Sequence, residues 1–411
     1  MKQFEVPIIY RSPLISAVKR QRRDSDKMKR DFRPTCLDFG PLQVFLARHF
    51  GFCYGVEHAI EIAFRTVDEN PDKRIFLLSE MIHNPHVNAD LRERGIIFLQ
   101  DTHGKQLVPF EDLTADDIVL IPAFGTTLEI ESKLRAIGLR TEPYDTTCPF
   151  VEKVWNRSEA IAKKGYTLVI HGKPSHEETR ATFSHAAAHA PAVVVRDLTE
   201  AKELARYIRN EIDPSEFIVR FRGQYSPGFD PVRDLQRIGV VNQTTMLASD
   251  TQEIADHLRQ VILEVHRPAE PSERFADTRD TLCYATNDNQ TAVAHMLDTE
   301  AELALIVGGY NSSNTSHLVE LCADRIPSFF VCDESRLVSA ERIRHFDLHT
   351  HAEKDTASWM PERQPLRILL TSGASCPDAL VEGVIERLTR LIPGCRPMDE
   401  LVREWTASDQ L

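Results

Sequence analysis

The chain has 411 residues, of which 42% are apolar and 27% are charged, and its formal net charge is −13 at pH 7. No apolar run reaches the roughly 18 residues of a membrane-spanning helix. The acidic balance argues against a general nucleic-acid surface, although a local anion-binding pocket is compatible with it. Because domains average about 150 residues, a chain of this length is expected to have several domains. Together these properties predict a globular protein that binds neither membranes nor nucleic acid.

The eight cysteines are spread thinly, without the dense spacing of a secreted disulfide scaffold. A reducing compartment is the simpler assumption. Residues 1–42 carry a basic run, VKRQRRDSDKMKRD, without a continuous apolar segment, and their acidic residues disfavour an organellar transit peptide. We interpret them as a polar N-terminal arm without chemistry and expect a cytoplasmic protein rather than a plastid one.

From Gln43 onward, short β-rich runs alternate with helical patterns, which is typical of parallel sheets flanked by helices. Most of these runs lead directly into a polar or glycine-containing turn, the place where open α/β sheets collect ligands. The predicted strands in chain order are QVFLA from Gln43, RIFLL from Arg74, DIVLIPA from Asp117, YTLVIHG from Tyr166, LALIVGG from Leu303 and LRILLTSG from Leu366.

Three cysteines share one setting, directly before a predicted helix. Cys53 lies in GFCYGV, Cys148 in DTTCP and Cys283 in DTLCYATNDNQ. The dipole and free N–H groups of a helix start favour the thiolate, the form that binds metal or attacks an electrophile. The cysteines are separated by about the length of a small α/β domain. This spacing predicts three modules that converge on a shared centre.

We expect the first predicted strand, residues 43–53, to belong to the first module or to pair with the third. The predicted divisions are an arm of residues 1–42, modules of residues 43–147, 148–279 and 280–392, and a C-terminal tail of residues 393–411.

Three thiolates from separate modules can hold a metal centre with one coordination position open. Two chemistries fit this count: a zinc ion with a bound water, or an iron–sulfur cluster with one ligand-binding iron. The other five cysteines lack this setting and are interpreted as plain thiols.

Polar residues gather after several predicted strands. MIHNPHVN, IHGKPSHEET and VNQTTML supply His83, His176, Glu178 and Thr244. GGYNSSNTSHL places hydroxyls, amides and backbone N–H groups at a helix start, a cradle suited to phosphate, and TSGASCPD repeats the theme with Ser375. Singly, each cluster is typical of helix caps and turns. Together they predict a diphosphate pocket without a Walker loop.

GFCYGV, DTTCP, HEET, NQTTM, CYATNDNQ, NSSNTSHL and TSGAS occur in this order. With them, roughly residues 40 to 390 resemble the 4-hydroxy-3-methylbut-2-enyl diphosphate reductases of the IspH or LytB family, in particular their plant and cyanobacterial branch. The resemblance implies an α/β fold of three modules in a trefoil-like arrangement around one 4Fe-4S cluster per chain. Its ligands would be Cys53, Cys148 and Cys283, with one iron open.

The resemblance also implies the reaction. Members of this family remove the C4 hydroxyl of an allylic diphosphate with two electrons and two protons. The products are isopentenyl and dimethylallyl diphosphates of the non-mevalonate isoprenoid pathway. No nicotinamide fingerprint is evident in the sequence. We therefore expect a ferredoxin- or flavodoxin-like electron donor.

Individual residues take roles from the same resemblance. Glu178 matches the proton-relay glutamate, with Glu177 as the alternative, and Thr244 matches a threonine near the substrate hydroxyl. Phe124 in PAFG stands where many bacterial members have a diphosphate-contacting histidine, and we leave it out of the site. The implied diphosphate ligands are His83, His176, Ser312, Asn314 and Ser375, with Ser313 in the same turn.

Two other functions stay open. A non-catalytic iron–sulfur redox sensor explains the three cysteines but not the phosphate-type turns. A zinc hydrolase would use the open position for water.

Overall fold

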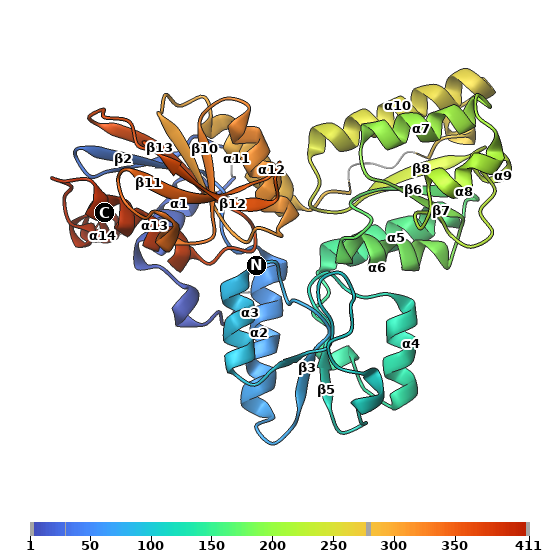
Figure 1. Ribbon diagram of the computed structural model, residues 1–411, viewed down its shortest axis with the longest axis horizontal. Coiled ribbons are helices and arrows are strands. Elements are labelled where there is room, and N and C mark those ends of the chain that lie inside the picture. The colour runs from blue at the N-terminus through green and yellow to red at the C-terminus, as the bar shows by residue number, and fades with distance from the viewer. Residues whose placement is uncertain (1–3, 29, 277–280, 408–411) are drawn as a thin grey trace. The chain divides into compact units, whose positions relative to one another are not determined.

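The computed structural model describes residues 4–28, 30–276 and 281–407 (Figure 1). The chain folds into two compact units, and two helices, α2 (Tyr54–Glu69) and α3 (Pro85–Glu93), each contain a boundary between them. Among the described residues, we find no helix with the length and apolar character needed to cross a membrane. Unit 1 comprises the described parts of residues 1–57, 83–87 and 284–411, and unit 2 those of residues 58–82 and 88–283.

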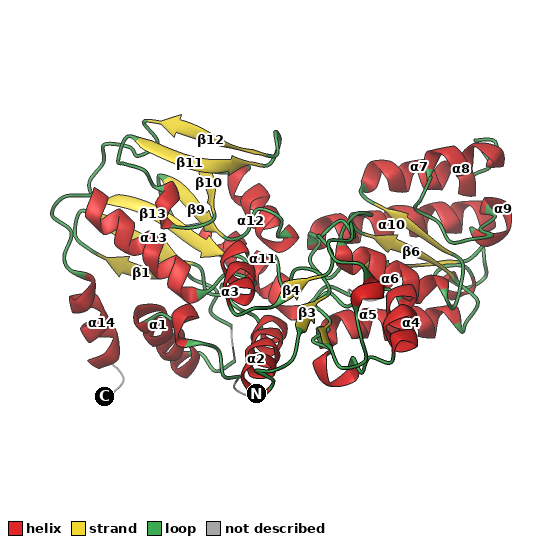
Figure 2. Ribbon diagram, turned by 60° about the horizontal axis from the view of Figure 1, so that its bottom comes forward, coloured by secondary structure: helices red, strands yellow, loops and turns green. Residues whose placement is uncertain are grey.

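Unit 1 is built on a seven-stranded sheet with the strand order β1-β2-β13-β9-β10-β11-β12, which Figure 2 shows from β12 at the top to β1. Its inner strands β2, β13, β9 and β10 are parallel, whereas β1, β11 and β12 run antiparallel to their neighbours. The strands are β1 (Thr35–Asp38), β2 (Leu42–Leu46), β9 (Leu303–Val307), β10 (Ser328–Val331), β11 (Arg342–Asp347), β12 (Ala352–Ala357) and β13 (Leu366–Ser372).

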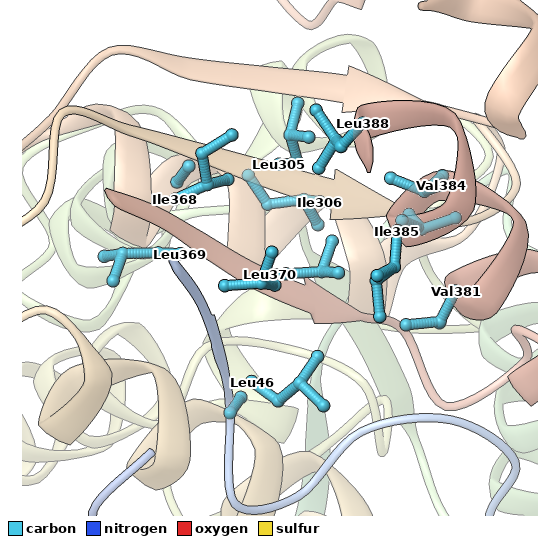
Figure 3. Close-up of a cluster of buried hydrophobic side chains, with 14 of the residues drawn as sticks. Leu46, Leu305, Ile306, Ile368, Leu369, Leu370, Val381, Val384, Ile385 and Leu388 are labelled. Atoms are coloured by element: carbon cyan, nitrogen blue, oxygen red, sulfur yellow. The ribbon is translucent and has the colours of Figure 1, made fainter. Parts of the chain in front are cut away.

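Helices cover this sheet because their apolar residues recur at helical spacing. In α13, Val381, Val384, Ile385 and Leu388 form one stripe, and Figure 3 shows this stripe beside residues of β9 and β13. All five residues of β9 are buried, so both faces of the sheet are covered. The helices that lie entirely in unit 1 are α1 (Pro13–Ser25), α11 (Tyr284–Met296), α12 (Ser313–Ala323), α13 (Asp378–Leu391) and α14 (Met398–Ala407).

Unit 2 contains two three-stranded parallel sheets, with the orders β4-β3-β5 and β7-β6-β8. In Figure 1, α7 and α10 lie on one side of the second sheet and α5 and α6 on the other. The strands are β3 (Ile75–Leu77), β4 (Ile97–Phe98), β5 (Ile118–Leu120), β6 (Thr167–His171), β7 (Ala192–Val195) and β8 (Ile238–Asn242). The helices are α4 (Leu128–Ile137), α5 (Pro149–Ala162), α6 (Glu177–Ala187), α7 (Leu198–Ile208), α8 (Phe217–Arg220), α9 (Pro231–Asp234) and α10 (Ala248–His266).

The second sheet of unit 2 is buried on both faces. Val169 of β6 belongs to the core under α7 and α10, while its neighbours Leu168 and Ile170 belong to the core on the α5 side. Successive strand residues point to opposite faces, so a continuous apolar run is what such a strand requires.

The predicted α/β class is confirmed, since strands alternate with helices and the inner strands of each sheet are parallel. All six predicted strands are present, as β2, β3, β5, β6, β9 and β13. Strand β2 pairs with β13, so residues 43–46 belong with the third predicted module.

The prediction of a polar N-terminal arm is wrong. Ser12 caps α1 by accepting the N–H of Ile15 at 2.9 Å, and Leu14, Ile15 and Val18 are buried in the core of unit 1. The basic residues that follow Val18 conceal the amphipathic pattern of this helix in the sequence. The predicted C-terminal tail is also folded, because Leu401 of α14 is buried in the same core.

Candidate functional site

Cys53 lies in a turn that the end of strand β13 supports. Its N–H donates to the carbonyl of Ala374 at 3.2 Å, and its carbonyl accepts the N–H of Glu57 in the first turn of α2 at 2.9 Å. Gly51, with φ of +79°, makes the preceding turn, a conformation that glycine adopts without strain. Cys53 is half-buried and lines a cavity of about 210 Å3 together with Lys19 and Arg48. The thiol therefore lies beside open space within unit 1.

The start of α12 has the properties of an anion cradle. Ser312 caps the helix, and its Oγ accepts the N–H of Thr315 at 3.3 Å and the Thr315 hydroxyl at 2.9 Å. The side chains of Ser313 and Asn314 are buried in the first turn. Asn314 Oδ1 accepts the N–H of Ala374 at 3.0 Å, which joins this helix start to the turn after β13. Free backbone N–H groups and the helix dipole favour an anion here.

His83 lies against the same two turns. Its carbonyl accepts the hydroxyl of Ser375 at 3.1 Å, and its Nδ1 lies 3.3 Å from Nδ2 of Asn311. A Cβ at Gly309 would overlap the His83 carbonyl, so that position requires glycine. Five predicted diphosphate ligands thus gather in unit 1: His83, Ser312, Ser313, Asn314 and Ser375.

The sequence analysis did not assign the supporting role of the side chains that hold these ligands in place. Asn311 contacts His83 and Thr315 contacts Ser312. Gly308 and Gly373 let the ends of β9 and β13 approach Thr315 closely. The signal was present, because a glycine pair after one strand and a glycine after its neighbour favour close approach of backbone.

In unit 2, Cys148 caps α5, with Pro149 at the first helical position. Its N–H donates to the carbonyl of Ala123 at 3.0 Å, which attaches the cysteine to the loop after β5. Burial, with a smaller contribution from the nearby Cys283, raises the pKa of Cys148 to about 12. The backbone N–H groups of the helix start lower this pKa, as the sequence suggests, but desolvation outweighs them.

Glu178 and Thr244 form a buried pair in unit 2. Glu178 Oε1 accepts the Thr244 N–H at 2.5 Å, and Oε2 accepts the Thr244 hydroxyl at 2.9 Å. Glu178 is almost fully buried, with 1% of the residue exposed. The carbonyl of Thr244 accepts the N–H of Cys283 at 3.2 Å. Thr244 therefore connects the buried carboxyl group directly to one of the predicted metal ligands.

His176 caps α6 with its imidazole. Its Nδ1 accepts the N–H of Glu178 at 3.2 Å. In a neutral imidazole with Nδ1 as acceptor, the proton is on Nε2, which can then donate to an anionic oxygen. The ring of Phe124 contacts the His176 ring edge-on, with centroids 5.6 Å apart and an interplanar angle of 84°. Phe124, left out of the site at the sequence level, therefore supports a predicted ligand.

Glu177 points elsewhere. Its Oε1 accepts the hydroxyl of Ser79, and the residue lines a cavity of about 240 Å3 together with Ser79, His103 and Arg180. Successive residues at a helix start point about 100° apart. The two adjacent glutamates thus face different surroundings, and Glu178 is the one tied to Thr244 and Cys283.

All eight cysteines lie among the described residues, and none of them forms a disulfide. Among the described residues, no group of three or more His, Cys, Asp or Glu side chains is placed to hold a metal ion. Cys53 belongs to unit 1, and Cys148 and Cys283 belong to unit 2. The three-cysteine metal centre stays a prediction.

These features define a class: an α/β protein in which free cysteines, a buried glutamate–threonine pair and a phosphate-type helix start follow parallel strands. Residues 44–389 match the family model described as LytB protein. A relative from Cyanothece sp. (strain PCC 7425 / ATCC 29141) is 40% identical over 354 residues, 86% of this chain and 85% of its own length. A relative from Synechococcus sp. (strain RCC307) is 42% identical over 353 residues, 86% of this chain and 84% of its own. Both are named 4-hydroxy-3-methylbut-2-enyl diphosphate reductase. The chain belongs to the LytB protein family.

Solved structures share the fold. The E-1-hydroxy-2-methyl-but-2-enyl-4-diphosphate reductase from Plasmodium falciparum aligns with a TM-score of 0.61 and 20% identity, over 89% of this chain and 98% of the other. A structure of (E)-4-hydroxy-3-methyl-but-2-enyl diphosphate reductase aligns with a TM-score of 0.52 and 23% identity, over 84% and 99%.

Proposed function

We propose that this chain is an iron–sulfur reductase that converts 4-hydroxy-3-methylbut-2-enyl diphosphate into isopentenyl diphosphate and dimethylallyl diphosphate. The observation that carries the proposal is the link from Glu178 through Thr244 to Cys283, a buried acid one residue away from a predicted cluster ligand. The names of relatives that are 40% and 42% identical over 86% of the chain support the same substrate.

We infer one 4Fe-4S cluster per chain, with Cys53, Cys148 and Cys283 as its ligands and one iron open. The donor set fits this group, because none of the three cysteines is in a disulfide and thiolates are the usual ligands of such clusters. When bound, the cluster supplies the electrons and a Lewis-acidic iron.

The substrate's diphosphate binds to the side chains and N–H groups at the start of α12. Ser312, Ser313 and Asn314 present hydroxyls, an amide and the free N–H groups of the first helical turn. His83 and Ser375 contact each other beside this turn, and His176 of unit 2 stays a further predicted ligand. A local site of hydroxyl, amide, imidazole and backbone donors is compatible with the acidic charge of the whole chain.

Glu178 holds the proton that converts the leaving hydroxyl group into water. Overall, the C4–O bond breaks, two electrons and two protons are consumed, and one water leaves. A carboxyl group shielded from solvent can retain a proton and deliver it, and the two hydrogen bonds from Thr244 fix its orientation. Thr244, whose hydroxyl contacts Glu178, is in position to contact the substrate hydroxyl as well. We assign the acid to Glu178 rather than Glu177, because Glu177 faces the separate cavity with Ser79.

The electrons come one at a time from a ferredoxin- or flavodoxin-like carrier. This follows from the one-electron chemistry of iron–sulfur clusters, and the sequence shows no nicotinamide fingerprint.

The test is anaerobic purification followed by metal and sulfide analysis and a substrate assay. We expect a brown protein with about four iron atoms and four acid-labile sulfides per chain, which oxidises a reduced viologen dye only when the allylic diphosphate is added. Zinc without sulfide would support a hydrolase. Iron and sulfide without substrate-dependent oxidation would support a redox sensor. Either result contradicts the proposal.

A further inference from the structure

A hydrogen-bonded turn follows strand β10 in unit 1 and is linked to two of the three segments that carry the diphosphate ligands there, the His83 segment and the loop before Ser312. This turn, residues 332–336, is called the anchor turn below. Within it, the Cys332 thiol donates to Asp333 Oδ2 at 3.2 Å and accepts from Arg336 Nε at 3.2 Å. Asp333 also accepts the Ser335 N–H at 2.8 Å. The turn is thus fixed by its own side chains.

The first contact of the anchor turn is with His86. Asp333 Oδ2 lies 3.2 Å from His86 Nε2. His86 comes three residues after His83, and Asn84 Oδ1 accepts the N–H groups of His86 and Val87 at 3.1 and 3.2 Å. The carboxylate raises the pKa of His86 to about 10, so the imidazole is cationic at neutral pH and the contact is an ion pair.

The second contact is with Tyr310, the residue directly before Asn311. Glu353 Oε1 accepts the Tyr310 hydroxyl at 2.8 Å and lies 2.9 Å from Arg336 Nε in the anchor turn. The Tyr310 ring also stacks on Phe346, with centroids 4.5 Å apart and an interplanar angle of 15°. The loop that leads into Asn311 and the Ser312 cap is therefore attached to the same anchor turn.

Residues 83–87 need such an attachment. They belong to unit 1, although residues 58–82 and 88–283 on either side belong to unit 2. No strand lies in these five described residues, so sheet pairing does not hold them. Their position in unit 1 depends on side-chain contacts, namely those of His83 with Asn311 and Ser375 and that of His86 with Asp333.

We propose that Asp333 is a positioning residue for diphosphate binding. Through His86 it holds the His83 segment, and through Arg336, Glu353 and Tyr310 the same turn holds the loop before Ser312. His83 and the ligands at Ser312 are thereby held at a fixed distance from each other, as binding of one diphosphate group requires. This inference rests on the proposed diphosphate site and adds a residue that touches neither substrate nor cluster.

The test is the Asp333→Asn variant of the full chain, purified with its cluster. Loss of the ion pair should weaken binding of inorganic diphosphate, measured by calorimetry, about fivefold, because the pair is partly solvent-exposed. KM for the allylic diphosphate should rise by the same factor, while kcat, iron content and melting temperature stay close to the wild-type values. The matched control is Asp355→Asn, which removes an ion pair with Arg344 at 3.1 Å in the same unit, without a link to His83.

A second variant keeps the inference testable if Asp333→Asn fails to fold. Tyr310→Phe removes the hydroxyl group that bonds Glu353 and Cys332 and keeps the ring, and it should weaken diphosphate binding about twofold to threefold. Unchanged diphosphate affinity in both variants would overturn the positioning role. The two proposals can fail separately. If the wild-type protein binds inorganic diphosphate but does not turn over the substrate, the proposed function is contradicted. The ratio of variant to wild-type diphosphate affinity would still decide the role of Asp333.

Discussion

Replacing Glu178 by glutamine tests the proposed acid with the smallest change of shape. Both oxygens of the carboxylate accept hydrogen bonds from Thr244, at 2.5 and 2.9 Å. A glutamine amide keeps one acceptor oxygen for the Thr244 N–H, and its NH2 group can donate to the Thr244 hydroxyl oxygen, which accepts as well as donates. No buried donor is then left unmatched. We therefore expect a folded variant with a melting temperature close to the wild-type value.

The effect on the rate should be much larger than the effect on folding. A positioned general acid contributes about 10²–10⁴-fold, which corresponds to roughly 3–5 kcal/mol in the barrier. The assay is steady-state oxidation of a reduced dye by the allylic diphosphate, with iron and sulfide measured on the same sample. Glu178→Gln should lose at least about a hundredfold in kcat while it keeps its cluster and binds diphosphate.

Glu177→Gln is the matched control, because the two residues are adjacent and both are buried. Its carboxylate contacts Ser79 and not Thr244, so kcat should stay within about threefold of the wild-type value. A near-normal kcat in Glu178→Gln together with a large loss of kcat in Glu177→Gln would refute the reasoning and assign the general acid to Glu177.

Three further predictions concern the cluster, the ion pair of His86 and the core of unit 1. Cys283→Ser should lose most of its iron and its turnover, and a full complement of iron with normal rates would contradict the ligand assignment. The Asp333 carboxylate raises the pKa of His86 to about 10 from an ordinary 6.5, so the ion pair stabilises fully below about pH 6.5 and is lost as the pH rises through 10. The free energies of urea unfolding of wild type and His86→Gln should differ by about 1 kcal/mol at pH 7, a small value because the His86 side chain is 40% exposed. This difference should vanish above pH 10. A difference that does not change with pH would exclude the ion pair. Ile385→Ala should lower the free energy of unfolding of unit 1 by about 2–5 kcal/mol, and a loss under 1 kcal/mol would mean that the α13 stripe is not core.

The inner strands could be predicted from sequence because burial on both faces requires continuous apolar runs, as in the LALIV of β9. The hairpin of β11 and β12 could not. Strand β12 reads AEKDTA and is almost wholly exposed, so its pairing depends on backbone hydrogen bonds and cross-strand charges such as Arg344 with Asp355. Side-chain periodicity carries no signal for such a strand. Helix α1 was missed for a related reason, since its buried apolar residues are confined to the first half and a run of basic residues fills the second half.

The ligand turns were predictable, whereas their supports were not. Glycine pairs, hydroxyl runs and a following helix are local patterns, and they identified Ser312 and Ser375. The contact between His86 and Asp333 joins residues 247 positions apart. Nothing in either local sequence distinguishes this pair from an ordinary histidine and an ordinary turn aspartate. Long-range pairing of this kind becomes visible only when the sheet has brought the two turns together.

Cys148 shows how burial can outweigh a local electrostatic effect that the sequence predicts. The sequence places its thiol at a helix start, and the dipole there favours an anion by about 1 kcal/mol. The sequence does not reveal that the thiol is withdrawn from water, and burial raises its pKa to about 12. Desolvation opposes the charged form of any buried acid. The helix start at Cys148 therefore orients the side chain but does not by itself ionise the thiol. A thiolate at Cys148 would need a neighbouring positive charge, and the iron of the proposed cluster would supply one.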